Sequence, residues 1–501
     1  MNNKTHQAST NWIMKGLRIT LVVAQATTST MLVFSLMNTG IISGWILALI
    51  IVALVALLVL NIVGLITRKR ASMTAQIVCA VISVACITIS CFAMSFTGAF
   101  NGFLDKVTEK RTETKAYSVA VEEDSDYYGI EDLKQKNIGF LSIDTKAGNA
   151  EQALQSKISF EASYYDDLST LLEVLKNDLS DAIVLESDRI EALKEADEKL
   201  LKETRVIYTF EVELNDKDIE ISKKAVTEEP FIVYISGSDS REGIKATARS
   251  DVNIVVAVNP KDAKILLVSI PRDTYVQLHN TTGIKDKLTH AGVYGIEMSK
   301  TTIEDFLGID IDYTIKVSFD TVIKVVDELD GIDINSDTAM RLSAMNKKIC
   351  DFVVGTQHVD GDCALRFARE RKTYQTGDRH RGENQQEVIT AIINKLSSSR
   401  DYILKLPAIL DIAADSFEAS LTREEITDFI RLQLQEQPKW QVKSIAINGT
   451  GTMLPTYSMG ANLPLYVMIP DEATVAEARA QINAYLSSNV NETETMDKNQ
   501  E

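Results

Sequence analysis

Three long apolar runs dominate the first hundred residues of the chain, at residues 19–37, 41–67 and 74–100. At a rise of about 1.5 Å per residue, a helix over each run can cross about 30 Å of hydrocarbon. A cleavable signal peptide would be one shorter apolar region followed by small residues, so the three runs predict a transmembrane anchor over residues 1–100. The alternative, a buried helical hairpin in a soluble protein, fits runs of this length poorly.

Basic residues set the predicted orientation of the anchor. Lys4, Lys15 and Arg18 precede the first run, and an Arg-Lys-Arg segment at 68–70 separates the second run from the third. Because positive residues are retained on the cytoplasmic side, both segments are expected inside. Three crossings then place everything after about residue 101 outside the cell, in a multi-pass cell-membrane protein.

Beyond the anchor, the pattern changes to strands that alternate with helices. A polar linker is expected at 101–118, followed by a small α/β accessory domain at 119–226 without an evident catalytic cluster. The acidic residues at 122–126 are interpreted as a solvated loop. The patterns in this domain predict strands at 136–141, 182–185 and 204–214 and helices at 164–179 and 188–201.

The segment 227–487 has the pattern of a sheet covered by helices, and the chain ends in a tail, 488–501, that is expected to be disordered. Ligand sites in such sheets usually lie where strands end. The predicted strands are 231–236, 252–258, 264–270, 313–318 and 440–447, and the predicted helices are 302–307, 319–329, 422–435 and 471–486. Between the last strand and the last helix, a loop rich in Gly and Thr is expected.

Charge and cysteine content narrow the function classes. A net charge of −18 argues against nucleic-acid binding, because a phosphate backbone rewards a basic surface. Cys79, Cys86 and Cys91 lie in an apolar run, and no metal-binding CxxC spacing is present. Cys350 and Cys363 form an even pair in the predicted extracellular part, so a disulfide between them is expected to contribute about 3 kcal/mol.

Positive charge is concentrated in one segment of this acidic chain, residues 365–386. It contains Arg366, Arg369, Arg371, Lys372, Arg379, His380 and Arg381. Arg369 and Arg371 are two residues apart and point the same way if the backbone is extended, whereas Arg381 and Gln385 share one face if it is helical. Two such elements could converge on a diphosphate, whose oxygens suit guanidinium groups. The alternative is a solvated basic helix that pairs with Glu370, Asp378 and Glu383.

Two carboxylates near predicted strand ends are candidate metal ligands. Asp239 follows the strand at 231–236 within a Gly-Ser turn, and Asp251 begins the next strand, two residues after Arg249. If the strand ends are neighbours, the pair could hold Mg²⁺, or Mn²⁺, beside a phosphate. The alternative for Asp239 is an ordinary Asx turn.

Three segments, ISGSDSREGIKATARSD at 235–251, VSIPRDTYV at 268–276 and the basic segment 365–386, together resemble the LytR-CpsA-Psr (LCP) family of cell-envelope proteins, and the chain looks most like the capsule-associated CpsA branch. The resemblance implies an α/β fold, with an extracellular LCP-type sheet flanked by helices, the accessory domain before it and the three-helix anchor at the N-terminus.

The resemblance also implies metal ligands at Asp239 and Asp251 and an active-site arginine at Arg249. The diphosphate ligands that it implies are Arg272, Lys287, Arg369, Arg371, Arg381 and Gln385. Asp378, which heads the D-x-x-R-x-x-x-Q pattern, is expected to cap a helix. Asn384 and Thr289 depart from the family pattern, where an arginine and an asparagine are frequent.

The resemblance also implies an activity. A phosphotransferase of class EC 2.7.8.-, with pyrophosphatase as a side activity, would move a polyprenyl-diphosphate-linked glycopolymer onto peptidoglycan and release polyprenyl phosphate. Capsular polysaccharide is expected as the polymer ahead of teichoic acid, and Asp239 or Asp251 would orient the attacking hydroxyl. A lipid-tailed substrate requires an apolar tunnel, for which the candidates are Ile315, Val317, Phe319, Val322, Ile323, Val326 and Leu329. The alternative for each of them is an ordinary core position.

Other partners and a competing function remain open. Membrane lipid and membrane proteins of capsule assembly are further expected partners, and nucleic acid is not. The competing hypothesis is a non-enzymatic membrane regulator, or attenuator, of envelope or capsule genes. Only about eighteen residues precede the first span, which argues against direct contact with DNA.

Overall fold

The computed structural model describes residues 2–67, 73–108, 113–142, 144, 147–187, 189–190, 193, 203–214, 224–238, 248–344, 347–374, 377–398, 409 and 417–487. These residues belong to two compact units. The first unit contains the three helices of the N-terminal hundred residues together with Thr422–Gln437. The second contains the rest of the described chain.

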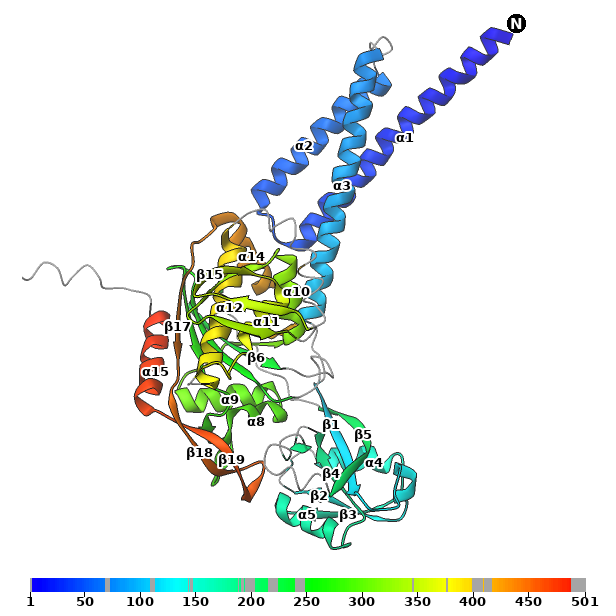
Figure 1. Ribbon diagram of the computed structural model, residues 1–501. Helices are drawn as coiled ribbons and strands as arrows, with labels where there is room; N and C mark the ends of the chain where they lie inside the picture. Colours follow the sequence, from blue (N-terminus) through cyan, green and yellow to red (C-terminus); the bar gives the residue numbers. More distant parts are fainter. Residues whose placement is uncertain are drawn as a thin grey trace, which may run out of the picture. The chain divides into compact units, whose positions relative to one another are not determined.

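Three long helices form most of the first unit: α1 (Asn2–Thr39), α2 (Gly44–Ile62), which continues through a π-helical turn to Thr67, and α3 (Met73–Thr108) (Figure 1). They contain three segments that are long and apolar enough to span a membrane, Met14–Thr39, Gly44–Thr67 and Met73–Lys106. Their apolar side chains point outward, as Phe34, Leu49 and Phe92 show with exposed fractions of 67%, 59% and 66%. An aqueous bundle would bury such side chains, so these helices suit a lipid environment.

Polar contacts join the helices of this unit. Gln25 lies fully buried and accepts hydrogen bonds from Asn61 and Ser83, both at 2.9 Å, so each of the three helices contributes one residue. Helix α14 (Arg423–Glu436), which the sequence placed within the domain at 227–487, clusters with the anchor. Its Arg423 contacts Asp105 of α3, and its Arg431 contacts the carbonyl of Gly40 in the α1–α2 loop.

The accessory part of the second unit is built on a five-stranded sheet in the order β3-β2-β4-β1-β5. The strands are β1 (Glu113–Glu122), β2 (Asn137–Leu141), β3 (Glu161–Tyr165), β4 (Ala182–Glu186) and β5 (Thr204–Leu214), and the helices include α4 (Ala147–Gln155) and α5 (Leu168–Lys176). The strands predicted at 136–141, 182–185 and 204–214 are confirmed. The helix predicted at 188–201 lies mostly outside the described residues.

Two predictions for this region were wrong. The expected linker at 101–118 is occupied by the end of α3 and the start of β1, because Tyr117, Val119 and Val121 alternate with polar residues and enter the core from a strand. The helix predicted at 164–179 begins only at Leu168. Tyr164 and Tyr165 end β3, and the Asp167 side chain accepts the Thr170 N–H as the helix cap.

The larger sheet has six strands in the order β16-β11-β6-β7-β8-β17. They are β6 (Phe231–Ser238), β7 (Val252–Asn259), β8 (Lys264–Ser269), β11 (Tyr313–Ser318), β16 (Phe417–Ala419) and β17 (Gln441–Ala446). Strand β7 runs antiparallel to β6 and β8, whereas β11 is parallel to β6 and β17 is parallel to β8. Four of the predicted strands are thus confirmed inside this sheet, and β17 matches the fifth.

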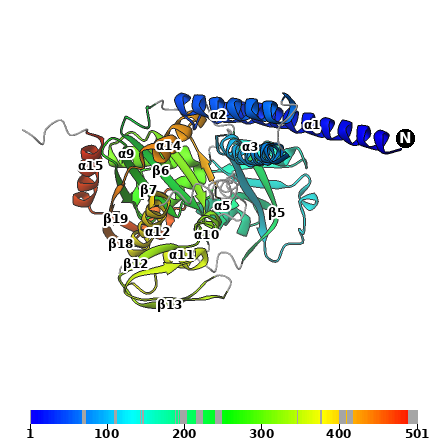
Figure 2. The same cartoon turned by 90° about the horizontal axis from the view of Figure 1, so that it is seen from above.

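Helices cover both faces of this sheet (Figures 1 and 2). One face packs against α8 (Leu288–Ala291), α9 (Ile296–Leu307) and α15 (Glu472–Leu486) around Tyr234, Val255 and Leu266. On the other side lie α10 (Phe319–Glu328), α11 (Gly361–Ala368) and α12 (Asp378–Ser398). The helix predicted at 302–307 is the last half of α9.

Short antiparallel ribbons complete the unit. They pair β9 (Tyr275–Val276) with β10 (Asp286–Lys287), β12 (Ile332–Ser336) with β15 (Gly355–Val359), β13 (Met340–Ser343) with β14 (Ile349–Phe352), and β18 (Gly449–Thr456) with β19 (Gly460–Pro470). The last pair stands where a Gly-Thr-rich loop was predicted, and that prediction was wrong. Glycine weakens strand propensity, but Gly451 here lies under the ring of Tyr466 from the partner strand.

Candidate functional site

Strand order brings Asp251 and Arg272 together. Asp251 precedes β7, and its N–H donates to the carbonyl of Gly237 in β6 at 2.9 Å. Because β8 runs antiparallel to β7, the end of β8 lies beside the start of β7, and Arg272 follows that end. The Arg272 Nη1 atom lies 2.8 Å from Asp251 Oδ1. The carboxylate predicted at one strand end therefore meets the arginine predicted at the next.

The segment 286–290 adds a lysine to this corner. Thr289 joins both neighbouring segments through its backbone: its N–H donates to the Arg272 carbonyl at 2.9 Å, and its carbonyl accepts the Ser250 N–H at 3.2 Å. Lys287 is buried, and its Nζ lies 3.1 Å from Asp273 Oδ1. Thr289 therefore uses its main chain to hold the segment in place, and the departure from asparagine at this position leaves that role intact.

Helix α12 approaches the same strand ends from the other side of the sheet. A Cβ at Gly382 would lie 2.6 Å from Ser269 Oγ, so glycine allows the close contact with β8. Gln386 is buried and donates to the carbonyls of Leu267, at 3.0 Å, and Ile445, at 2.7 Å. This places the buried Arg381 with its Nη2 at 3.3 Å from the Asp251 carbonyl.

Gln385 lies on the buried side of α12, as its four-residue spacing from Arg381 predicts. Asn384, where the family often has arginine, faces the protein: its amide donates to the Phe367 carbonyl at 3.1 Å and to the Tyr374 hydroxyl at 3.3 Å. Asn384 therefore ties α12 to the end of α11. Helix α12 begins at Asp378 as expected, although the Asp378 side chain lies outside the described residues.

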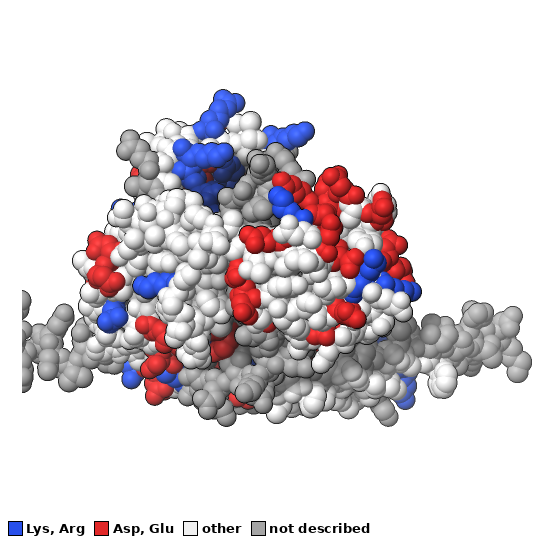
Figure 3. All heavy atoms as spheres, turned by 90° about the horizontal axis from the view of Figure 1, so that it is seen from below, with Lys and Arg blue, Asp and Glu red and all other residues white. Residues whose placement is uncertain are grey.

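A cavity of about 610 Å³ opens among these cations. Its charged wall consists of Arg272, Asp273, Lys287, Arg371, Lys372 and Arg379. A space-filling view shows Lys and Arg side chains gathered around a hollow, while Asp and Glu side chains lie over other parts of that face (Figure 3). Arg272, Lys287 and Arg371, three of the six predicted diphosphate ligands, line this cavity, whereas Arg369, Arg381 and Gln385 are not among its lining residues.

The sequence motifs did not identify the uncharged wall of this cavity. It carries Asn448, Gly449, Gly451, Tyr466 and Met468 from β18, β19 and the turn before them. These residues have no charge, and their segment was assigned to a loop. The alternation of Leu465, Val467 and Ile469 with other residues was the available strand signal, and the glycines hid it.

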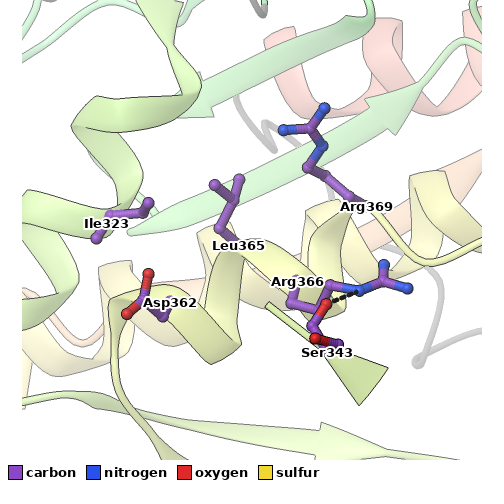
Figure 4. Close-up of a pocket in the computed structure, with 6 residues that line it drawn as sticks. All are labelled: Ile323, Ser343, Asp362, Leu365, Arg366 and Arg369. Atoms are coloured by element: carbon purple, nitrogen blue, oxygen red, sulfur yellow. Dashed lines mark hydrogen bonds between the residues drawn. The ribbon is translucent and has the colours of Figure 1, made fainter. Parts of the chain in front are cut away.

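Arg369 and Arg371 face different cavities. Their two-residue spacing suggested an extended backbone that points both arginines the same way. This prediction was wrong, because Arg369 ends helix α11 with helical dihedrals. Arg371 lines the 610 Å³ cavity, whereas Arg369 lines a second cavity of about 220 Å³. Figure 4 shows Leu365 and Arg369 on α11 and Ile323 on α10 around this second cavity, with Arg366 bonded instead to the Ser343 carbonyl at 3.1 Å.

The predicted tunnel residues divide between core and cavity. Ile323 lines the 220 Å³ cavity. Val326 and Leu329 are fully buried, and Val322 and Val326 belong to an ordinary core cluster. Ile315 and Val317 are half-buried on β11, and the Phe319 side chain lies outside the described residues.

Local acids neutralise part of the basic segment, as the alternative interpretation expected. Arg366 pairs with Glu370, and Arg379 lies 3.3 Å from Glu383. Burial would raise the pKa of the Glu370 carboxyl, but the hydrogen bonds from Thr373 and the charge of Arg366 hold that pKa below its usual value. The segment thus contains both surface-type pairs and residues that line cavities.

The Mg²⁺ expectation can be compared with the oxygen donors present. Asp239 lies outside the described residues. Arg249, two residues before Asp251 in the sequence, is half-buried. Within the described ranges, no group of three His, Cys, Asp or Glu side chains could hold a metal ion. A single carboxylate such as Asp251, 22% exposed beside Arg272, still fits Mg²⁺, which takes one or two carboxylates and fills its shell with phosphate and water.

Cys350 and Cys363 form a disulfide with Cα atoms 5.6 Å apart. The bond links β14 to α11, the helix that ends at Arg369.

Comparisons with known proteins agree with the motifs. Residues 190–471 match the model of the LytR_cpsA_psr family. The polyisoprenyl-teichoic acid–peptidoglycan teichoic acid transferase TagU of Halalkalibacterium halodurans is 32% identical over 263 residues, which cover 52% of this chain and 80% of the relative. The protein of the same name from Bacillus subtilis is 34% identical over 240 residues, with 48% and 74% covered. Among solved structures, B. subtilis TagV aligns with 52% of this chain and 98% of its own, at 29% identity and a TM-score of 0.43.

Proposed function

Because this chain belongs to the LytR-CpsA-Psr family, we propose that it is a membrane-anchored phosphotransferase that moves a polyprenyl-diphosphate-linked glycopolymer onto peptidoglycan outside the cell. The observation that carries the proposal is the convergence of Arg272, Lys287 and Arg371 on one cavity, although Arg371 follows Lys287 by 84 residues along the chain. Few ligands other than a diphosphate need so many cations in so small a volume. The three apolar helices supply the anchor.

The two cavities suit the two ends of such a donor. The charged wall of the 610 Å³ cavity suits the diphosphate, and its uncharged wall leaves room for sugar rings. The 220 Å³ cavity next to Arg369 also contains Ser343, Asp362 and Arg366, and its apolar residues, Ile323 and Leu365, suit the first isoprene units of the lipid. Arg369, at the edge of this cavity, would then contact the lipid-proximal phosphate.

In the proposed reaction, the hydroxyl of a peptidoglycan sugar attacks the sugar-bearing phosphorus. A new P–O bond forms to the acceptor, and the bond to the lipid phosphate breaks. Polyprenyl phosphate leaves, and the hydroxyl proton passes to a carboxylate, Asp251 or Asp239, or to solvent. Arg272, Lys287 and Arg371 stabilise the negative charge on the transferring group and on the leaving phosphate, which is the main need of phosphoryl transfer.

Asp251 and Asp239 would hold Mg²⁺ or Mn²⁺ in this scheme, and the ion would supply further charge neutralisation at the phosphate oxygens. The Asp251 carboxylate also holds Arg272 in place at 2.8 Å. Its removal should therefore affect both the metal requirement and the donor affinity.

The polymer is a separate question. The resemblance to the CpsA branch favours a capsular polymer, whereas the relatives compared above are named for teichoic acid. Both donors belong in the test, because the diphosphate site by itself does not distinguish them.

The experiment uses the full-length protein in detergent with Mg²⁺, a polyprenyl-diphosphate-linked sugar and a peptidoglycan oligomer. Wild type should release polyprenyl phosphate and form the glycan–peptidoglycan product. Arg272→Ala and Arg371→Ala should lose at least about 100-fold in rate, since each removes a charge-assisted contact to the transferring phosphoryl group. Arg341→Ala is the matched control, because Arg341 is 73% exposed and pairs only weakly with Asp351, at 3.4 Å. Equal product from all variants would refute the proposal and favour a non-catalytic regulator.

A further inference from the structure

The ribbon β18–β19 connects the accessory domain with the 610 Å³ cavity. At its tip, Met459 and Leu465 are buried in one cluster with Leu141, Leu168 and Leu171 of the accessory domain. At its base, Gly449, Gly451, Tyr466 and Met468 form the uncharged wall of the 610 Å³ cavity. Figure 1 shows the ribbon reaching from the main sheet toward α5. One two-stranded element is therefore part of both the accessory core and the candidate site.

Arg189 of the accessory domain holds the tip of this ribbon. Its guanidinium is 2% exposed and lies 2.8 Å from the Glu186 carboxylate. It donates to the Ser458 carbonyl, and its Nη2 donates to the Tyr294 hydroxyl at 3.1 Å. Burial raises the pKa of Glu186, but the charges of Arg189 and Lys115 outweigh it, so the pKa lies well below its usual value and the carboxylate stays ionised. A buried ion pair thus faces the ribbon and Tyr294.

Ser458 continues the chain of contacts toward the cavity. Its N–H donates to Asp286 Oδ2 at 2.9 Å, and its hydroxyl donates to Asp286 Oδ1 at 3.2 Å. Asp286 is fully buried, lies 2.6 Å from His290 Nδ1, and immediately precedes Lys287. A displacement of Ser458 would therefore move the backbone that carries Lys287.

The ribbon also bonds to the backbone at Asp273 and close to Lys287. The Tyr457 N–H donates to the Lys285 carbonyl at 3.0 Å, two residues before Lys287. The Met468 N–H donates to the Asp273 carbonyl at 2.7 Å. The position of the pair thus depends on the ribbon at two points, in addition to the route through Asp286.

We propose that the accessory domain positions the diphosphate site, and that Arg189 is the positioning residue, which fixes Lys287 and the uncharged cavity wall through Ser458 and the β18–β19 ribbon. Arg189 does not touch substrate. It acts because a buried guanidinium with three acceptors permits one orientation of the ribbon tip, and each bond to a charged donor is strong and directional. The assignment concerns how the site is held, and so it goes beyond the proposed reaction.

Two mild variants test the proposal in the full-length protein. Tyr294→Phe removes one acceptor from Arg189, and Ser458→Ala removes the hydroxyl that bonds Asp286. Arg189→Lys keeps the buried positive charge but carries it on a single donor nitrogen. Lys176→Ala is the control, because the Lys176 side chain is 63% exposed and pairs with the exposed Glu203 of the accessory domain, at 2.8 Å.

The first readout is hydrogen exchange, which requires no activity. In Tyr294→Phe and Ser458→Ala, the amides at 285–290 and 449–468 should exchange about tenfold faster, while those of β2 and β4 keep wild-type rates. The second readout is the affinity for inorganic pyrophosphate, which should weaken about tenfold, the size expected for one buried hydrogen bond to a charged group. Arg189→Lys should show smaller changes than Arg189→Ala in both.

The outcomes separate this proposal from the proposed reaction. If exchange at 285–290 and pyrophosphate affinity stay at wild-type values in Tyr294→Phe and Ser458→Ala, the positioning role is refuted, whatever the transfer assay shows. If exchange and affinity change as expected while no variant and not even wild type transfers polymer, the positioning role stands and the reaction fails. If Arg189→Ala only lowers the unfolding temperature, with unchanged exchange at 285–290, the contact is merely structural and the proposal is wrong.

Discussion

Replacing Gln386 by leucine should loosen helix α12 and weaken the site without touching any substrate contact. Gln386 is 3% exposed, and its Nε2 donates to the carbonyls of Leu267 in β8 and Ile445 in β17. Leucine has nearly the same volume but no donor. Two carbonyls would lose a partner, at about 1–3 kcal/mol for each buried group left unsatisfied, so a loss of roughly 2–6 kcal/mol is expected.

The assay is thermal unfolding of the full-length protein, together with the affinity for pyrophosphate. At roughly 2–4 °C per kcal/mol for a domain of this size, the unfolding temperature should fall by about 4–24 °C. Affinity should also fall, because Arg381 and Gln385 belong to the same turns of α12. The control is Gln441→Leu on β17, whose side chain is exposed, and it should change neither quantity by much. An unfolding temperature within 1 °C of wild type for Gln386→Leu would contradict the reasoning.

Three further predictions follow from the same structure. Reduction of the Cys350–Cys363 bond should lower stability by about 3 kcal/mol, as measured by unfolding with and without reductant, and reactive thiols at both positions before reduction would contradict it. The stability that Glu370 contributes should be full above about pH 4.5 and lost as the pH falls through its lowered pKa. In denaturant unfolding, the free energies of wild type and Glu370→Gln should therefore converge in acid, and a difference between them that stays constant with pH would refute this. Ile323→Trp should fill the 220 Å³ cavity and weaken geranylgeranyl diphosphate binding while leaving pyrophosphate binding unchanged, with the exposed Val353→Trp as control; equal losses for both ligands would exclude a lipid-binding role for this cavity.

The sequence predicted local features of this protein far better than it predicted their relative geometry. The apolar runs and the strands of the main sheet were identifiable because hydrophobic periodicity is a local signal. The helical backbone at Arg369 was not identifiable, because the Asp360 cap and the burial of Phe367 in the core fix helix α11, and the spacing of two arginines reveals neither contact. These contacts, and not the spacing, decide where Arg369 and Arg371 point.

The β18–β19 ribbon shows the same limit more strongly. Gly449 and Gly451 made the segment look like a loop, since glycine is a poor strand former in isolation. In the fold, their missing side chains let Tyr466 and the chain at 468–469 approach closely. A pattern that argues against a strand locally is thus required by the packing across it.

The cations of the site are held in place before any ligand binds. Arg272 lies against Asp251 and Lys287 against Asp273, so each of these two cations has an acidic neighbour that fixes it and reduces repulsion between them. Such an arrangement lowers the reorganisation needed when an anionic group enters, which is the main advantage of a preorganised site. It also explains why an acidic chain can contain this pocket.

The overall charge has a consequence for how a donor reaches the pocket. The formal charge of −18 gives the protein no net attraction for the anionic diphosphate of the proposed donor, and a Debye length of about 8 Å at physiological salt confines the attraction of the pocket to its immediate surroundings. Electrostatic steering therefore cannot deliver the donor. The three apolar helices can, because a lipid-linked donor and an anchored protein share one bilayer, which raises their effective concentration without any new contact. In the proposed reaction, the anchor thus substitutes for charge as the means of bringing donor and site together.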